Sequence, residues 1–306
     1  MSQTSTTGSS LWQSPEWKSY QESLGRETRV YGARNDSGEL EASALCVIDR
    51  TLGGLSVWDI PRGPVGASKE AILSLLEHVV SEARKDKCMA IYYSPFEVTS
   101  YKLQVTSSRH EQPEATVVLD LNLSDEELLS QMKQKGRYNI SVATKRGVIV
   151  RESKDIDSFY KLLSKTGKRD KFGIKPKGHY EKFMKELPGS FLLLAFLEDV
   201  PVAGLMGTTW GTTGYYYYGA SDYEHRSSMA PYLLQAEAMK HCRSKGCEEY
   251  DLLGIAPNDD PSHHFAGITR FKKQFGGEVI TYPPEREIVL KPIAKMMLGW
   301  KRKIFG

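Results

Sequence analysis

The stretch that decides the fold is residues 190–220, SFLLLAFLEDVPVAGLMGTTWGTTGYYYYGA. It holds apolar runs at residues 190–197, 202–209 and 214–220, separated by the short polar turns EDVP and WGTT. This is the pattern of an antiparallel meander. Apolar residues at helical spacing follow at residues 230–244, and residues 248–253 read as another strand. A meander that is followed by a helix and a further strand predicts a mixed sheet.

A comparable order of elements runs through the first part of the chain. Strands are predicted at residues 28–33, 42–49, 54–59 and 88–93. Residues 68–85 form a predicted amphipathic helix with Ser68 as its N-cap. A chain of 306 residues holds about two domains. We therefore predict an α/β (α+β) fold of two tandem acetyltransferase-like (GNAT-type) domains with mixed sheets.

The boundary between the two domains is expected near Pro113, after a polar stretch. The first domain covers residues 1–113 and the second covers residues 114–280. The second opens with a strand at residues 116–121 and a helix that starts with the capping box of Ser124 and Glu127. Further elements are predicted as helices at residues 137–146, 156–164 and 180–186 and as a strand at 148–151. The tail, residues 281–306, contains a strand at 286–290 and a basic helix.

Charge is unevenly distributed along the chain. The net charge is +3, but basic residues gather at residues 132–147, 161–177 and 291–303. Such clusters attract a polyanion or an anionic membrane surface. They are equally typical of solvated helix faces, so charge alone leaves both interpretations open.

The residue inventory argues against several chemistries. The four cysteines are too scattered for a disulfide framework or a zinc site, and they predict free thiols in a cytoplasmic protein. No G-x-S-x-G elbow, Walker A loop or G-x-G-x-x-G motif is found. His263 and His264 are expected to point apart, so no metal site is predicted. The polar residues 1–10 carry no signal-peptide pattern, and the longest apolar run is far below the roughly 20 residues of a membrane span.

The turn before residues 230–244 bears on coenzyme A. An acetyltransferase holds the pyrophosphate of this cofactor on backbone N–H groups at a helix start, which requires small residues. The matching turn here is RSSMAP, residues 226–231. Met229 and Pro231 stand where small residues are needed, and proline has no N–H. We therefore predict that the protein uses no cofactor.

Several separated motifs occur together in one order. They are PRGP (61–64), QKGRYNI (134–140), RDKFGI (169–174), YDLLGI (250–255) and GITRFKKQFGG (267–277). With these motifs the chain resembles the Fem (FemABX) peptidoglycan interpeptide-bridge aminoacyltransferases, from about residue 13 to residue 283. It is similar to the short form of the family, without the inserted helical hairpin.

The resemblance implies an activity and partners. Members of this family move an amino acid from aminoacyl-tRNA onto the stem peptide of a peptidoglycan precursor, which is a lipid-linked or UDP-linked muropeptide. It also implies that residues 281–306 return to complete the first domain. An aminoacyl ester is already activated, so the enzyme needs to orient the amine and stabilise an oxyanion, without a cofactor.

Two residues are implied as catalytic. Lys272 matches the Phe-Lys position of the family and is expected to hold an anionic substrate group or the tetrahedral intermediate; a solvated lysine in a basic turn is the alternative. Tyr218 is expected as a nearby hydroxyl donor. The alternative for Tyr218 is a packed strand residue, since alternate strand positions face opposite sides. No catalytic carboxylate is identifiable, so proton removal falls to water or to a substrate phosphate.

The expected muropeptide contacts depart from the family's pattern. Ser94 replaces an acidic residue, Gln21 replaces a lysine, and Lys175 with His179 replaces an Arg…Tyr pair. These changes leave the acceptor open, with a lipid-linked precursor favoured over a UDP-linked one. The predicted substrate-binding residues are Gln21, Arg62, Ser94, Lys175, His179 and Tyr180.

The resemblance also implies partners for the basic clusters. The residues expected to contact tRNA phosphates are Lys133, Lys135, Arg137, Lys145, Arg146 and Lys273. The tail mixes basic residues with Met296, Met297, Trp300 and Phe305, which suits a peripheral contact with the inner face of the plasma membrane. Packing of these apolar residues on the first domain is the alternative. Two other functions stay open: a coenzyme A-dependent N-acetyltransferase, and a non-catalytic RNA- or envelope-binding protein.

Overall fold

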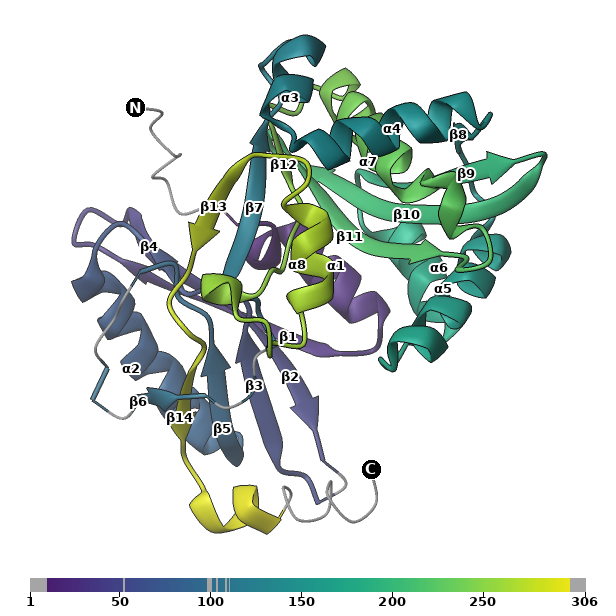
Figure 1. The fold of residues 1–306 in the computed structure, drawn as a ribbon. Helices are drawn as coiled ribbons and strands as arrows, with labels where there is room; N and C mark the ends of the chain where they lie inside the picture. Colours follow the sequence, from purple (N-terminus) through teal and green to yellow (C-terminus); the bar gives the residue numbers. More distant parts are fainter. Residues whose placement is uncertain are drawn as a thin grey trace. The chain divides into compact units, whose positions relative to one another are not determined.

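The computed structural model describes residues 10–51, 53–97, 101–102, 104–107, 109 and 111–297. The chain forms two compact units. Unit 1 comprises Met1–Glu114 and Tyr282–Gly306, and unit 2 comprises Ala115–Thr281. Each unit contains its own mixed sheet (Figure 1). The predicted fold class is therefore confirmed.

Unit 1 is built on a sheet with the strand order β1-β2-β3-β5-β14-β6, with β4 paired to β2. Its elements are α1 (Pro15–Ser23), β1 (Glu27–Arg34), β2 (Leu40–Arg50), β3 (Ser56–Ile60), β4 (Val65–Gly66), α2 (Lys69–Lys85), β5 (Cys88–Tyr93), β6 (Gln104–Thr106) and β14 (Arg286–Val289). Strands β3 and β5 are parallel because α2 carries the chain across between them. Strand β14 comes from the tail and pairs antiparallel with both β5 and β6.

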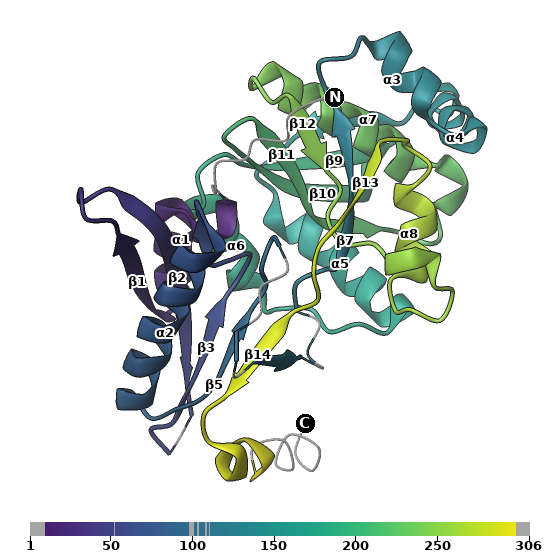
Figure 2. The ribbon, with the colours of Figure 1, turned by 90° about the vertical axis from the view of Figure 1, so that its left-hand side faces the viewer.

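Helix α2 covers one face of this sheet (Figure 2). The Ser68 hydroxyl caps its first turn by accepting a hydrogen bond from the N–H of Ala71, as predicted. Leu75, Leu76 and Val79 recur at helical spacing and are buried in the core of unit 1. Full burial of each such side chain contributes roughly 1.5–3 kcal/mol.

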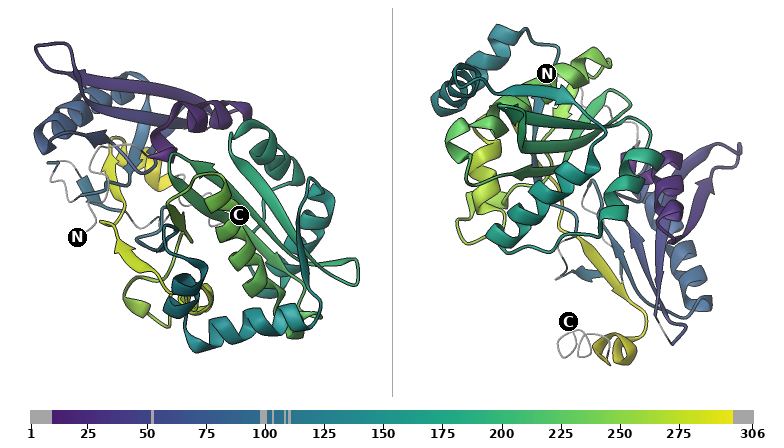
Figure 3. Two further views of the ribbon diagram at one scale, coloured as in Figure 1. Left: turned by 90° about the horizontal axis from the view of Figure 1, so that it is seen from above. Right: turned by 90° about the vertical axis from the view of Figure 1, so that its right-hand side faces the viewer.

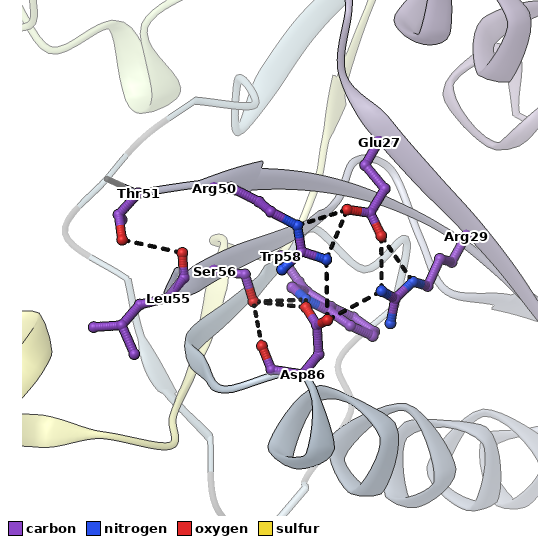
Figure 4. A network of polar contacts seen from close by, with 8 residues as sticks. All are labelled: Glu27, Arg29, Arg50, Thr51, Leu55, Ser56, Trp58 and Asp86. Carbon is purple, nitrogen blue, oxygen red and sulfur yellow. Dashed lines mark hydrogen bonds and ion pairs between the residues drawn. The ribbon is translucent and has the colours of Figure 1, made fainter. Parts of the chain in front are cut away.

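A polar network ties the end of α2 to the sheet (Figure 4). The carboxylate of Asp86, the C-cap of α2, accepts hydrogen bonds from Arg29 and Arg50, each at 3.0 Å, and from Ser56 at 2.9 Å. The indole N–H of the fully buried Trp58 donates to the same carboxylate at 3.1 Å. One carboxylate thus connects α2 with β1, β2 and β3.

Unit 2 contains the predicted meander. Its sheet has the order β13-β7-β12-β11-β10-β9-β8. Its elements are β7 (Ala115–Asp120), α3 (Asp125–Gln131), α4 (Gln134–Lys145), β8 (Ile149–Glu152), α5 (Ile156–Asp170), α6 (Lys177–Glu186), β9 (Ser190–Leu197), β10 (Val200–Trp210), β11 (Thr213–Ser221), α7 (Ala230–Ser244), β12 (Glu249–Asp251), α8 (Ala266–Lys272) and β13 (Glu278–Thr281). Strands β11 and β12 are parallel, with α7 between them. The crossover therefore repeats the one formed by β3, α2 and β5.

Helices cover both faces of the second sheet (Figure 3). Phe191 and Leu193 of β9 point into the core that α7 closes. Gly204 of β10 faces the other way, because a Cβ at this position would lie 2.8 Å from Phe159 of α5. The strands are apolar on both faces for this reason, and they read as continuous apolar runs in the sequence.

The structure corrects two predicted elements of unit 2 and confirms a third. Helix α5 extends to Asp170, whereas the prediction ended at residue 164. The segment expected as a basic turn forms α8 through Lys272, and only the residues after it form a turn. The capping box of Ser124 and Glu127 is present as predicted.

Candidate functional site

Lys272 is the last residue of α8, and its side chain is only 7% exposed. Its ammonium nitrogen donates hydrogen bonds to two backbone carbonyl oxygens, that of Leu253 at 3.0 Å and that of Gly254 at 2.8 Å. The alternative of a solvated turn lysine is therefore wrong. An ammonium group carries three hydrogens, so one hydrogen is left for a substrate oxygen.

The turn after β12 supplies both of these carbonyls. Leu253 has φ 54°, in the left-handed region that non-glycine residues rarely adopt. The carboxylate of Asp251 stabilises this conformation, because its Oδ1 accepts a hydrogen bond from the N–H of Leu253 at 2.7 Å. The same oxygen accepts from the hydroxyl of Thr116 on the neighbouring strand β7. Asp251 lies in the YDLLGI motif, but no pattern in the sequence indicates its role in shaping this turn.

Burial lowers the pKa of Lys272 to about 7, and the nearby charge of Asp251 opposes this effect. The amine is thus poised between its charged and neutral forms near neutral pH. An anionic group beside it would raise the pKa and favour the ammonium form. The ring of Tyr216 lies beside the same nitrogen, with its centroid 5.5 Å from Nζ.

Tyr218 belongs to a different side-chain cluster. Strand β11 contains a bulge opposite Met206 and Gly207, where Met206 pairs with Tyr218 and Gly207 with Tyr216. Tyr217 is the extra residue, and the rings of both Tyr217 and Tyr218 contact Phe183 of α6. Successive side chains of β11 therefore do not alternate strictly between the two faces of the sheet at this bulge. The tyrosine beside Lys272 is Tyr216.

The hydroxyl of Tyr218 lies 3.0 Å from Nε2 of His179. Burial lowers the pKa of His179, and Lys175 lowers it further, so the imidazole is neutral at pH 7. Tyr180 is buried beside them, and its hydroxyl accepts a hydrogen bond from the backbone N–H of Lys175 at 3.1 Å. The structure thus brings together four predicted residues, Lys175, His179, Tyr180 and Tyr218.

The other three predicted substrate residues lie in unit 1. Gln21 is buried on α1 and accepts a hydrogen bond from Arg26 at 3.1 Å. Arg62 is buried as well; its guanidinium donates to the carbonyl of Pro113 at 2.6 Å and lies 3.9 Å from the centroid of the Tyr282 ring. Ser94 is buried just after β5. Their substrate contacts stay predictions.

The residues predicted for RNA contact lie mainly along α4. Lys133, Lys135 and Lys145 are exposed. Arg137 donates to the carbonyl of Met132 at the end of α3, and Arg146 donates to the carbonyl of Ser227. Lys273 is half-buried just beyond α8. Most of these cations are thus on the surface of one helix.

The start of α7 bears on coenzyme A binding. Met229 is the N-cap residue in a left-handed conformation, with φ 55°, and it offers no side-chain cap. The N–H of Tyr232 bonds to the carbonyl of Met229 at 2.9 Å, and Pro231 has no N–H. This turn therefore lacks the free donors that would hold a pyrophosphate.

No group of three or more metal-ligating side chains occurs within the described residues. The rings of His263 and His264 lie 4.2 Å apart between centroids, so the expectation that they point apart is wrong. The Nδ1 atom of His263 accepts from the N–H of Phe265 at 3.1 Å, which engages this ring in its own turn. No described helix is long and apolar enough to span a bilayer.

The architecture defines the general class of the protein. Its two mixed sheets, each with a helix between a pair of parallel strands, form a tandem acetyltransferase-type fold. A solved tandem GNAT protein from the clavulanic acid biosynthesis pathway has the same fold, with a TM-score of 0.52 and 10% identity over 86% of this chain and 82% of that one.

The sequence narrows this class to one family. The FemAB family model matches residues 2–110, 100–198 and 194–297, so the chain belongs to the FemAB family. The structure of FemX superposes with a TM-score of 0.81 at 20% identity and covers 95% of both chains. The Lipid II:glycine glycyltransferase of Staphylococcus haemolyticus is 22% identical in an alignment 297 positions long, which covers 69% of this chain and 71% of that enzyme.

Proposed function

We propose that this protein is an aminoacyltransferase that forms peptidoglycan interpeptide bridges, taking the amino acid from aminoacyl-tRNA. Membership of the FemAB family supports the reaction class. The observation that carries the proposal is the buried Lys272, held by the carbonyls of Leu253 and Gly254 in a unit of acetyltransferase type. The domain bounds proposed with it are residues 1–113 with 281–306, and 114–280.

The reaction requires few groups from the protein. The acceptor amine attacks the ester carbonyl of the aminoacyl group, and the ribose hydroxyl of the tRNA leaves. Lys272 donates its remaining N–H to the oxygen that becomes negatively charged, which is where an electrostatic contribution is largest. The amine proton passes to water or to a substrate phosphate, which in turn returns a proton to the departing ribose oxygen. Tyr218 is proposed to contact the substrate from the separate cluster that it forms with His179, and not to share the oxyanion with Lys272.

The acceptor in this proposal is a lipid-linked muropeptide. The staphylococcal relative is, by its name, a glycyltransferase that acts on Lipid II. Ile293, Met296 and Met297 in the tail are 57–72% exposed, which supports membrane contact over packing on unit 1 for these three residues. Trp300 and Phe305 lie outside the described residues. Exposed apolar side chains next to Lys291 and Lys295 suit peripheral contact with the inner face of an anionic membrane.

The two competing functions receive less support. The turn before α7, with Met229 and Pro231, argues against a coenzyme A-dependent N-acetyltransferase. A non-catalytic RNA- or envelope-binding protein would show no turnover. The test is to incubate the full chain with charged total tRNA and lipid-linked precursor and to measure the mass of the product.

The decisive variant is Lys272→Met, which keeps the length of the side chain and removes the charge. It should lower transfer by at least the roughly 10²–10³-fold expected for losing one oxyanion donor. The matched control is Lys245→Met, at an exposed lysine beyond α7, which should transfer as the wild type does. Equal activity of both variants would refute the role of Lys272. No transfer by the wild type would refute the proposed function.

A further inference from the structure

A pocket opens between α4 and the start of α7. Its volume is about 330 Å³, and it is lined by Tyr138, Val142, Lys145, Arg146, Ser227 and Met229. All of these residues belong to unit 2. Tyr138 is 66% exposed, which is a large exposed fraction for an aromatic residue. The pocket therefore combines one exposed aromatic residue with two cations, Lys145 and Arg146.

Helix α4 places these groups by its periodicity. Gly136, Asn139 and Ala143 are buried. Lys135, Tyr138, Val142 and Lys145 follow at steps of three and four residues and form a second stripe on the helix surface. Along this stripe, Tyr138 and the half-buried Val142 lie between two exposed lysines. Basic residues interleaved with an aromatic ring are the pattern of a surface that binds single-stranded nucleic acid.

The same helix is fixed next to the proposed reaction centre. The N–H of Lys133 bonds to the carbonyl of Gln274 at 3.0 Å, two residues beyond Lys272. Gly136 permits this close approach, since a Cβ there would lie 2.5 Å from the Gln274 oxygen. From Gly136 to Lys145 the helix rises about 14 Å at 1.5 Å per residue. That length corresponds to roughly four nucleotides of a stacked strand.

An anion in this pocket must be bound by side chains, because the backbone N–H groups at the start of α7 are engaged or missing. The N–H of Ala230 is directed to the hydroxyl of Ser228 at 3.4 Å, Pro231 has no N–H, and the N–H of Tyr232 is used by Met229. Arg146 is fixed at the rim by its hydrogen bond to the carbonyl of Ser227. Lys145 and Arg146 are thus the groups that can meet phosphates.

We propose that this pocket binds a single-stranded RNA segment, with one base stacked on Tyr138 and the adjacent phosphates on Lys145 and Arg146. The inference rests on the proposed function, since an aminoacyl-tRNA must extend from its reacting ester along the surface of unit 2. It adds a specific base contact to the phosphate contacts proposed for α4. Any base can stack on an aromatic side chain. The pocket should therefore bind single-stranded RNA with little preference for its sequence.

The test uses the full chain and a fluorescent single-stranded RNA of about eight nucleotides. Tyr138→Ala should weaken binding roughly 5- to 150-fold, as expected for the loss of one stacked base. Tyr138→Phe keeps the ring and should bind within about twofold of the wild type. The matched control is Tyr223→Ala, which removes another exposed tyrosine of unit 2 that lies outside the pocket. This control should bind as the wild type does.

The cations are tested separately by salt dependence. Lys145→Gln should lower the slope of log affinity against log salt by about 0.7, the value for one phosphate of a single strand. This variant also serves if Tyr138→Ala fails to fold. Unchanged RNA affinity in Tyr138→Ala, an equal loss in Tyr223→Ala, or an unchanged salt slope in Lys145→Gln would overturn the inference. So would RNA binding too weak to measure in the wild type.

Transfer assays on the same proteins separate this inference from the proposed function. If the wild type and Tyr138→Ala transfer equally and bind RNA equally, the pocket assignment is wrong and the proposed function stands. If the wild type binds RNA through Tyr138 but transfers nothing, the proposed function is wrong and the pocket assignment stands. Binding of coenzyme A that requires Tyr138, without binding of RNA, would overturn the pocket assignment.

Discussion

The ammonium nitrogen of Lys272 lies 2.8 Å from the carbonyl oxygen of Gly254, inside unit 2. A backbone carbonyl orients a lysine without neutralising it, so the amine keeps its ability to bind an anion. The nearby carboxylate of Asp251 supports the charge of the amine and also holds the turn that carries the carbonyl. The charge and the position of the Lys272 amine thus depend on Asp251, which need not contact the substrate.

This arrangement predicts the pH dependence of transfer. The pKa of Lys272 is about 7, so the ammonium form is lost as the pH rises through 7, and the transfer rate should fall there. Asp251→Asn keeps an oxygen for the N–H of Leu253 but removes the charge that raises this pKa. The falling limb of the pH profile should therefore move to lower pH. Initial rates, corrected for spontaneous ester hydrolysis, measure this shift.

Glu249→Gln provides the control for Asp251. It removes an exposed carboxylate from the same strand, β12, and should leave the pH profile unchanged. Coincident profiles for the wild type and both variants would show that Asp251 does not tune Lys272. A purely structural role for Asp251 would lower the rate equally at every pH.

Tyr218→Phe separates the hydroxyl of this residue from its ring. The phenylalanine keeps the packing against Phe183 and loses the hydrogen bond to His179. We expect the free energy of unfolding to change by about 1 kcal/mol or less, while transfer falls roughly 10²-fold or more. Tyr160→Phe, which alters a ring packed on Tyr180, is the control and should retain activity. Normal transfer by Tyr218→Phe would remove Tyr218 from the catalytic proposal.

Asp86 is predicted to stabilise unit 1. Asp86→Ala removes the acceptor shared by Arg29, Arg50, Ser56 and Trp58, which should lower the free energy of unfolding by roughly 1.5–3 kcal/mol. Urea unfolding at pH 7 measures this loss. Asp36→Ala, at an exposed turn, should change stability by less than about 0.5 kcal/mol.

The Asp86 network also predicts a pH dependence of stability. Burial raises the pKa of Asp86, but hydrogen bonds from Arg50, Ser56, Trp58 and Arg29 lower it more, to about 2. A carboxylate with a lowered pKa contributes stability above its unfolded pKa of about 4, and this contribution is lost as the pH falls towards 2. The difference between the wild type and Asp86→Ala should therefore narrow between pH 4 and pH 2. A constant difference over that range would contradict this assignment.

The exposed side chains of the tail predict membrane binding. Met296→Asp combined with Met297→Asp should reduce cosedimentation with phosphatidylglycerol vesicles and leave the thermal unfolding midpoint unchanged. Val30→Asp, at an exposed apolar residue of β1, is the control and should still cosediment. A truncation at Pro292 gives an independent outcome. If it unfolds the protein, the tail serves unit 1 rather than the membrane.

Much of the fold could be predicted because its signals are local. Residues 88–93, 190–197 and 230–244 have the predicted boundaries, since their periodicity ends at turn-forming or polar residues. Helix α8 was not predicted because it is only 7 residues long and contains Gly267. It is stabilised by tertiary packing, with Phe271 against Tyr232 and Lys272 buried.

The site was harder to predict than the fold. The partners of Lys272 are backbone carbonyls, which no side-chain pattern reveals. The bulge in β11 moves Tyr217 and Tyr218 to one face, and only the pairing with β10 shows this shift. Four predicted residues, Tyr218 among them, do meet, because α6 places His179 and Tyr180 against the sheet.

The central claim is that this chain moves an amino acid from tRNA to a peptidoglycan precursor. The most direct test incubates the wild type with lipid-linked precursor and total tRNA charged with radiolabelled amino acids, with and without ribonuclease. The precursor should gain the mass and label of one aminoacyl residue, and ribonuclease treatment before the reaction should abolish this gain. Labelling that survives ribonuclease, or that requires acetyl coenzyme A, would contradict the account.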